Sequence, residues 1–262
     1  MKARFGVRTT TALAVTAVAA IVVSAVPVPA TADVAGQPGS PDHWGVVTRD
    51  TIGSPVAALR TGPFGSFGVP GAAARPPYGR GSLAIAVADR ATSLDPPSEA
   101  VHFGDETDFY GDPVLRLRQV GFHVFQTGEN VSYGGTGNMP NIRFEIDPNL
   151  ASAPATTYSS MVWNPPPSPV VDQWSPYLDA TRTGTWYLTG SAGATTRCTA
   201  ARPCGFRSLL TALDDGGARP VVFTAGVSKG RDYLWNGAVD GLRINDVVYD
   251  FEADGVRARP AV

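Results

Sequence analysis

The sequence predicts an all-β protein, an antiparallel β-sandwich of the jelly-roll type with one short helix near residues 205–215. Three observations lead to this fold class. Short segments of alternating apolar and polar residues recur along the chain, separated by Gly- and Pro-rich connections. Only one segment has the spacing of an amphipathic helix, so strands do not alternate with helices as in an α/β fold. The chain ends in a strand pair that would complete a sheet. A closed barrel is the alternative that the same pattern allows.

The first 32 residues have the features of a secretory signal peptide. Three basic residues within the first eight positions precede an apolar run at residues 11–26, and the small-residue site Ala30-Thr31-Ala32 follows. The run has 16 residues, which is short of the roughly 20 that span a bilayer. We therefore expect cleavage after residue 32 and a secreted product.

The rest of the chain predicts one domain with a short extension at each end. We expect residues 33–41 to form a flexible leader, residues 42–252 a single β-sandwich and residues 253–262 a C-terminal tail. Because the tail is not apolar, we expect no integral membrane anchor after signal cleavage.

Charge limits the class of partner. Residues 1–32 hold three of the 21 basic residues and none of the 23 acidic ones, so the mature chain has 18 basic residues and a net charge of −5. An acidic chain without a basic cluster is a poor partner for nucleic acid or anionic lipid. We expect no nucleic-acid binding.

Alternation of apolar and polar residues defines the strands. It is clearest at residues 141–146, where Ile142, Phe144 and Ile146 face one way while Arg143 and Glu145 face the other, toward solvent. Other segments with strand character lie at residues 44–47, 55–59, 82–88, 114–125, 158–163, 185–188 and 220–227. Residues 130–138 predict a Gly-rich hairpin loop, and residues 101–110 an acidic segment.

The single helix and the single cysteine pair lie close together in the sequence. Apolar residues at i, i+3, i+4 and i+7 predict a helix from Phe206 to Leu213, and Gly216-Gly217 ends the pattern. Cys198 and Cys204 are the only cysteines. In an exported protein we expect them to form a disulfide, which closes a short loop and contributes about 2 kcal/mol.

The closing strand pair spans residues 235–252. Alternating residues lead to a turn at Asn245-Asp246, and a second segment rich in β-branched and aromatic residues follows. This hairpin would complete a sheet whose other strands precede it.

Several motifs resemble those of a set of secreted bacterial β-sandwich proteins, over most of residues 42–252. They are P-P-Y-G-R-G-S-L at 76–83, P-N-I-R-F-E-I-D at 140–147, Y-S-S-M-V-W at 158–163 and V-D-G-L-R-I-N at 239–245, with Y-D-F-E at 249–252. This resemblance implies a secreted β-sandwich and carries no activity with it. The strand at 239–244 also resembles that of jelly-roll carbohydrate-binding modules, which implies a sugar ligand.

Two patterns would indicate an enzyme if they were complete. Residues 226–230 match G-x-S-x-G, but all three histidines lie upstream and no helix pattern follows, so we expect a surface turn. Glu145-Ile146-Asp147 resembles the first half of the E-x-D-x-x-E signature of laminarinase-type glycoside hydrolases. The third carboxylate is missing at Asn149 and Leu150, and hydrolysis needs that acid.

Acidic groups offer a possible calcium site. Carboxylates and backbone carbonyls are the ligands that Ca²⁺ prefers, but no EF-hand spacing is present. The candidates are Asp105, Glu106, Asp108 and Asp112 in one group and Asp240, Asp246 and Asp250 in another, of which Asp105, Asp108 and Asp240 are the principal ones. A solvated acidic loop is the alternative for each group.

The leading functional hypothesis is a non-catalytic module that binds glycan or another cell-envelope component. Trp174 and Tyr177 lie in a segment without strand alternation, so we expect an exposed aromatic pair that stacks on sugar rings, with Arg143 and Glu145 as polar partners. The alternatives are a secreted polysaccharide hydrolase or lyase acting through Glu145 and Asp147, and a purely structural or protein-interaction domain.

Overall fold

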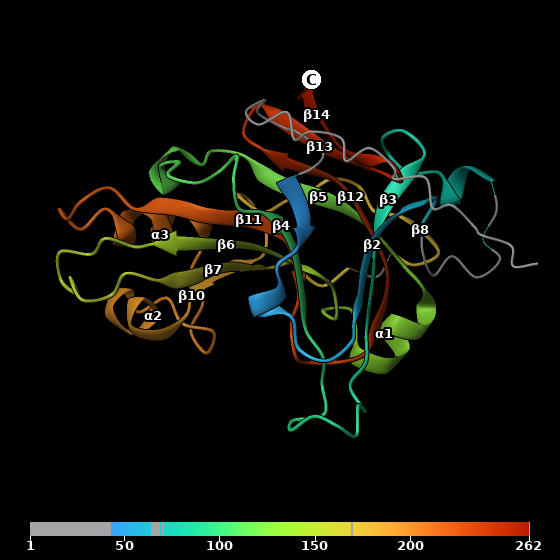
Figure 1. Ribbon diagram of the computed structural model, residues 1–262, viewed down its shortest axis with the longest axis horizontal. Helices are drawn as coiled ribbons and strands as arrows, with labels where there is room; N and C mark the ends of the chain where they lie inside the picture. Colours follow the sequence, from blue (N-terminus) through green and yellow to red (C-terminus); the bar gives the residue numbers. More distant parts are fainter. Residues whose placement is uncertain (1–42, 64–68, 70, 169, 262) are drawn as a thin grey trace, which may run out of the picture. The chain divides into compact units, whose positions relative to one another are not determined.

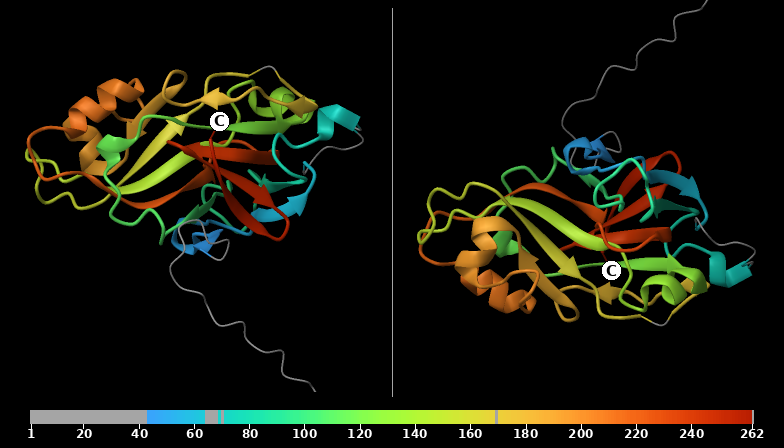
Figure 2. Two further views of the ribbon diagram at one scale, coloured as in Figure 1. Left: turned by 90° about the horizontal axis from the view of Figure 1, so that it is seen from above. Right: turned by 90° about the horizontal axis from the view of Figure 1, so that it is seen from below.

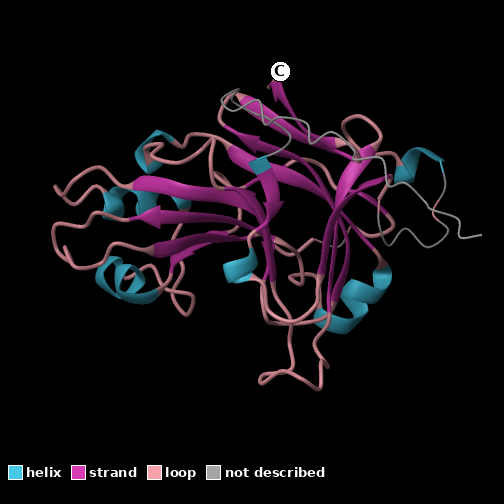
Figure 3. Ribbon diagram, viewed as in Figure 1, coloured by secondary structure: helices cyan, strands magenta, loops and turns pink. Residues whose placement is uncertain are grey.

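The computed structural model describes residues 43–63, 69, 71–168 and 170–261. The predicted signal peptide and leader lie outside the described residues. None of the helices in the described part of the chain has the length and apolar character needed to cross a membrane. Two antiparallel sheets dominate the described residues, in which only three short α-helices accompany them (Figures 1 and 3). The predicted all-β sandwich is confirmed.

The first sheet has six strands, which follow one another in the order β1-β4-β11-β6-β7-β10. Their bounds are Trp44–Val46 (β1), Val101–Asp105 (β4), Val221–Lys229 (β11), Asn141–Asp147 (β6), Ser159–Asn164 (β7) and Thr185–Leu188 (β10). A 3₁₀ turn, η2 (Thr48–Asp50), follows β1 and contacts β4.

The second sheet is built around the long strand β12 (Trp235–Ile244). One edge of β12 pairs with β5 (Val120–Gln126); the other pairs first with β3 (Gly81–Val87) and then with β13 (Val247–Glu252). The remaining strands are β2 (Val56–Thr61) beside β3, β14 (Gly255–Pro260) beside β13, and β8 (Gln173–Trp174) and β9 (Leu178–Asp179) beside β5.

One glycine marks the point where β12 changes partner. Gly241 has φ +63°, a conformation in which side chains other than that of glycine are strained. A Cβ at this position would also lie 2.3 Å from the Tyr78 ring. The glycine thus lets β12 bend from β3 toward β13 while Tyr78 packs against it.

The core consists of the inward residues of both sheets, joined in one apolar cluster. Ile142, Phe144 and Ile146 are fully buried, as their alternation predicts. Three tryptophans, Trp163, Trp186 and Trp235, are among the largest buried side chains. Burial of such side chains supplies the main favourable term in folding.

The predicted helix is confirmed as α3 (Phe206–Leu213), whose Phe206 ring packs 5.5 Å from that of Trp186. Two further helices, α1 (Gly128–Gly134) and α2 (Gly190–Thr196), were not predicted. Helix α1 replaces part of the expected hairpin loop at 130–138. Glycines weaken the helical signal of both segments. Helix α2 contacts α3, whereas α1 lies apart from them (Figure 2).

Two strands also differ from expectation. The acidic segment at 101–110 begins with β4, which lies between β1 and β11 in its sheet. The expected C-terminal tail contains β14, which pairs with β13 along its whole length. Most β14 residues are exposed, as is usual for an edge strand, so apolar alternation cannot reveal it.

The two cysteine sulfurs lie 2.02 Å apart, at disulfide-bond distance. Backbone groups beside them pair with β10, since the Leu188 N–H donates to the Cys198 carbonyl at 2.8 Å and the Trp186 N–H to the Cys204 carbonyl at 2.7 Å. The disulfide therefore closes the loop after α2, and these backbone hydrogen bonds join that loop to the edge strand of the first sheet.

Candidate functional site

The four residues predicted to bind a ligand lie in two different sheets. Trp174 belongs to β8, and Tyr177 directly precedes β9, both beside β5. Arg143 and Glu145 belong to β6 of the six-stranded sheet. The hydrogen bonds and ring contacts of the two pairs involve different neighbours.

The aromatic pair is half-buried and packed against β5. The Trp174 ring lies 5.8 Å from that of Phe125. The Tyr177 ring lies 5.8 Å from that of His123 and fills the space above Gly121, where a Cβ would lie 2.6 Å from the ring. Burial raises the pKa of the Tyr177 hydroxyl. Both rings therefore already serve as packing groups.

The Arg143–Glu145 side of β6 was expected to be solvated, and this expectation is wrong. Glu145 is 0% exposed. Its carboxylate accepts hydrogen bonds from Arg143 at 2.9 Å and from Thr224 at 3.4 Å, and also from Arg49 and the Tyr158 hydroxyl. The reason is η2, which lays Arg49 over this face of the sheet and excludes water from the carboxylate.

The same turn places Asp50 against Arg143 and His102. The Arg143 guanidinium donates to Asp50 at 2.8 Å, and His102 Nδ1 lies 3.3 Å from the other Asp50 oxygen. Burial lowers the pKa of His102 despite its bond to Asp50. Burial acts to raise the pKa of Asp50, but the His102 hydrogen bond and the Arg143 charge outweigh it, so that this pKa lies below its usual range. A neutral imidazole thus donates to an ionised carboxylate.

This network contains acids, a histidine and arginines, and its carboxylates are paired, although His102 Nε2 and Arg143 Nε are buried with no hydrogen-bond partner among the described residues. Every carboxylate oxygen of Glu145 has a donor, and an arginine charge lies against both Glu145 and Asp50. This pairing of the carboxylates suits a structural clamp between η2 and the sheet.

The arrangement gives no support to the two enzyme hypotheses. Glu145 is held by arginines, while Asp147 accepts the Asn149 N–H at 3.1 Å in a local turn. The G-x-S-x-G segment was expected to be a turn, but it lies almost entirely within β11, where Ser228 pairs with His102 in the strand register. A nucleophile elbow needs a strand-to-helix turn, and β11 continues through this serine.

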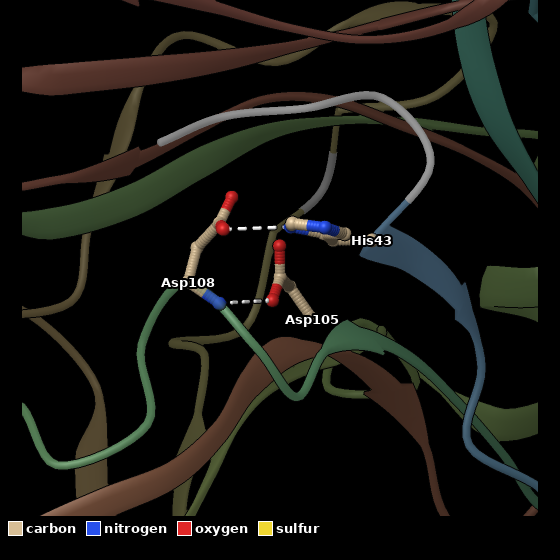
Figure 4. Close-up of side chains that lie close together, drawn as sticks. All are labelled: His43, Asp105 and Asp108. Carbon is tan, nitrogen blue, oxygen red and sulfur yellow. Dashed lines mark hydrogen bonds and ion pairs between the residues drawn. The ribbon is translucent and has the colours of Figure 1, made fainter. Parts of the chain in front are cut away.

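The acidic candidates for a metal separate into different places. Asp105 and Asp108 come together with His43 at the end of β4 (Figure 4). Burial raises the pKa of Asp105, and the Asp108 charge adds to this rise. Asp240 lies in β12, where it accepts N–H groups of Tyr78 at 3.0 Å, Gly241 at 2.7 Å and Phe251 at 3.2 Å. Asp246, in the hairpin turn, forms an ion pair with Arg118.

The structure reveals an exposed aromatic pair that sequence reasoning missed. Tyr133 in α1 is 43% exposed and Tyr233 in the β11–β12 connection is 50% exposed. Their ring centroids lie 6.4 Å apart with planes at 85°, and the Arg90 guanidinium lies 5.7 Å from the centre of the Tyr133 ring. The two tyrosines are 100 positions apart in the chain, so no local pattern could have joined them.

Chain neighbours of both tyrosines, though not the two rings themselves, line a pocket of about 360 Å³. Glu129, one helical turn before Tyr133, lines it, as do Leu234, directly after Tyr233, and Asn236. Apolar residues of β3 and β12 form other parts of its wall. The side-chain oxygen of Asn236 has no hydrogen-bond partner among the described residues. We call this combination of Tyr133, Tyr233 and the adjoining cavity the tyrosine pocket.

Two backbone-anchored side chains shape the tyrosine pocket. Asn130 exchanges hydrogen bonds with the Asn236 backbone, at 2.7 Å and 3.0 Å, so α1 is fixed to β12. The Glu99 carboxylate accepts the N–H groups of Ser54 and Ala88, each at 2.9 Å. Hydrogen bonds to the backbone therefore fix Asn130 and Glu99, two of the polar side chains that line the pocket.

Comparison of the chain with protein-family models, with curated proteins and with solved structures gives no match.

Proposed function

We propose that this chain is an exported, non-catalytic module that binds a glycan or a similar polar cell-envelope component at the tyrosine pocket. The observation that carries the proposal is the exposed Tyr133–Tyr233 pair together with a cavity that chain neighbours of both tyrosines line and whose wall includes amide and carboxylate groups. Sugars present apolar ring faces to aromatic side chains and hydroxyl groups to amides and carboxylates.

Other features favour this site over the predicted one. The Trp174 and Tyr177 rings pack against β5, and Glu145 is enclosed by Arg49, Arg143 and Tyr158. By contrast, Tyr133 and Tyr233 are each exposed over about half of the residue surface. A sugar could contact these rings without displacing any packed side chain.

The test is a screen of the purified chain against arrayed polysaccharides and cell-wall fragments, followed by titration of any ligand found. We expect Tyr233→Ala and Tyr133→Ala each to weaken binding about tenfold, because an aromatic contact of roughly 1.4 kcal/mol is lost. Trp174→Ala tests the site predicted from sequence and should leave the affinity unchanged.

Tyr110→Ala is the matched control. Tyr110 is also exposed and stacks on an aromatic neighbour, Phe223, at 5.8 Å, but it lies in the connection after β4. Equal losses in Tyr110→Ala and Tyr233→Ala would show non-specific adhesion. Absence of any glycan ligand would also contradict the proposal.

A further inference from the structure

His43, Asp105 and Asp108 form a compact group at the start of β1 and the end of β4 (Figure 4). One potential ligand atom from each residue lies within 4.8 Å of the other two. The three side chains come from two segments about 60 residues apart in the sequence, brought together by the pairing of Trp44 with Asp105. The pairing of β1 with β4 therefore brings the three side chains together.

Among the described residues, one carboxylate oxygen of Asp105 accepts hydrogen bonds and the other accepts none. Its Oδ1 accepts the N–H groups of Thr107 at 2.7 Å and Asp108 at 2.8 Å. The residue is 0% exposed, and its Oδ2 has no hydrogen-bond partner among the described residues. Figure 4 shows this second oxygen beside the line that joins Asp108 to His43.

A buried carboxylate oxygen without a donor costs free energy, and a second carboxylate beside it adds repulsion. Among the described residues, no lysine or arginine forms an ion pair with Asp105. The potential ligand atoms of Asp50, His102 and Glu145 also lie within 4.8 Å of one another, but there Arg49 and Arg143 supply positive charge. Asp105 thus lacks, among the described residues, the arginine partners that Asp50 and Glu145 have.

We propose that His43, Asp105 and Asp108 bind a divalent transition-metal ion of the zinc class. An imidazole nitrogen with two carboxylate oxygens is a ligand set that Zn²⁺ accepts at about 2.0–2.2 Å. Ligands at that distance from a tetrahedral ion lie roughly 3.4 Å apart, whereas His43 Nδ1 lies 2.7 Å from Asp108 Oδ1, so this hydrogen bond would have to open to admit the ion. Calcium binds 6–8 oxygen atoms, so the imidazole argues for a different ion from the one the sequence predicts.

Bound metal would join the start of β1 to the end of β4. His43 directly precedes β1, and Asp105 is the last residue of β4, so the ion would cross-link the edge of the six-stranded sheet. A ligand that binds only the folded state raises the unfolding temperature. This inference is independent of the glycan proposal, and either can fail alone.

The experiment uses the full chain, stripped with a chelator and supplied separately with Zn²⁺, Mn²⁺ or Ca²⁺. Bound metal is measured by mass spectrometry after desalting, and the unfolding temperature is measured in parallel. We expect about one equivalent of Zn²⁺ per chain and a higher unfolding temperature. Asp105→Asn and His43→Gln should each reduce Zn²⁺ affinity at least tenfold, while His123→Gln, which keeps the cluster intact, should bind as wild type.

His43→Gln guards against a folding failure of Asp105→Asn, because the His43 side chain is partly exposed; circular dichroism checks both. Less than about 0.1 equivalent of Zn²⁺ on the wild-type chain would overturn the proposal. So would equal Zn²⁺ binding by wild type and the folded His43→Gln variant. Tighter binding of Ca²⁺ than of Zn²⁺ would overturn the metal class.

Discussion

At the scale of single residues, Glu145 shows how burial changes what a carboxylate does. We expect Glu145→Gln to lower the free energy of unfolding by about 3 kcal/mol, because it leaves Arg49 and Arg143 without their shared buried charge. Urea unfolding measures the loss. The hydrolase hypothesis instead expects an intact fold with lost turnover, so one variant separates the two roles.

Glu106→Gln makes the same chemical change at the exposed end of the network. Glu106 also pairs with Arg49, but its side chain is 49% exposed. Exposed ion pairs contribute about 0–1 kcal/mol, so this variant should unfold close to wild type. Similar losses in Glu106→Gln and Glu145→Gln would mean that burial is not the cause.

At the scale of strands, three paired glycines lie side by side across β1, β4 and β11. Gly45 pairs with Gly104, and Gly104 pairs with Gly226. A Cβ at Gly226 would lie 2.2 Å from the Phe103 carbonyl oxygen and 2.9 Å from His102 Nε2. We expect Gly226→Ala to destabilise the chain by about 3 kcal/mol through this overpacking, as measured by thermal unfolding.

Gly45→Ala provides the comparison within the same row. Apart from its chain neighbours, no atom of the described residues lies within 4 Å of a Cβ at Gly45, and alanine restricts the unfolded chain more than glycine does. This variant should therefore be neutral or slightly stabilising. A loss as large as that of Gly226→Ala would show that strand propensity, not the clash at the centre of the sheet, determines the effect.

Elements with a strong local pattern could be predicted, and those defined by distant partners could not. Ile142, Phe144 and Ile146 alternate and become core, and Phe206 to Leu213 has helical spacing and forms α3. Strand β14 is recognisable only from its pairing with β13.

The same limit applies to the candidate sites. Sequence reasoning placed Asp105 and Asp108 in one acidic group, but it could not add His43, which the pairing of β1 with β4 supplies. It could not foresee that η2 would bury Glu145, or that α1 would carry Tyr133 to Tyr233. Contacts of this kind depend on strand register and tertiary packing, which residue composition and local spacing in the sequence do not reveal.

At the scale of the whole molecule, buried carboxylates should make stability depend on pH. Burial raises the pKa of Asp240 to about 8, and the nearby Asp250 charge adds to the rise, against three N–H donors that lower it. Asp250 is itself paired with Arg259 at 2.6 Å. Between about pH 4 and pH 8 the folded state retains a proton on Asp240 that the unfolded chain has released.

The free energy of unfolding should therefore fall as pH rises through this window, by at most about 1.4 kcal/mol per pH unit for one proton. His102 acts in the opposite sense, because its lowered pKa removes stability as pH falls below 6.5. Urea unfolding of wild type and Asp240→Asn from pH 5 to pH 8 isolates Asp240, since both chains retain His102. We expect the wild type to lose stability relative to the variant as pH rises.

Asp246→Asn, at an exposed turn, should show the same pH dependence of stability as the wild type. A difference between wild type and Asp240→Asn that stays constant with pH would show that Asp240 does not hold the proton.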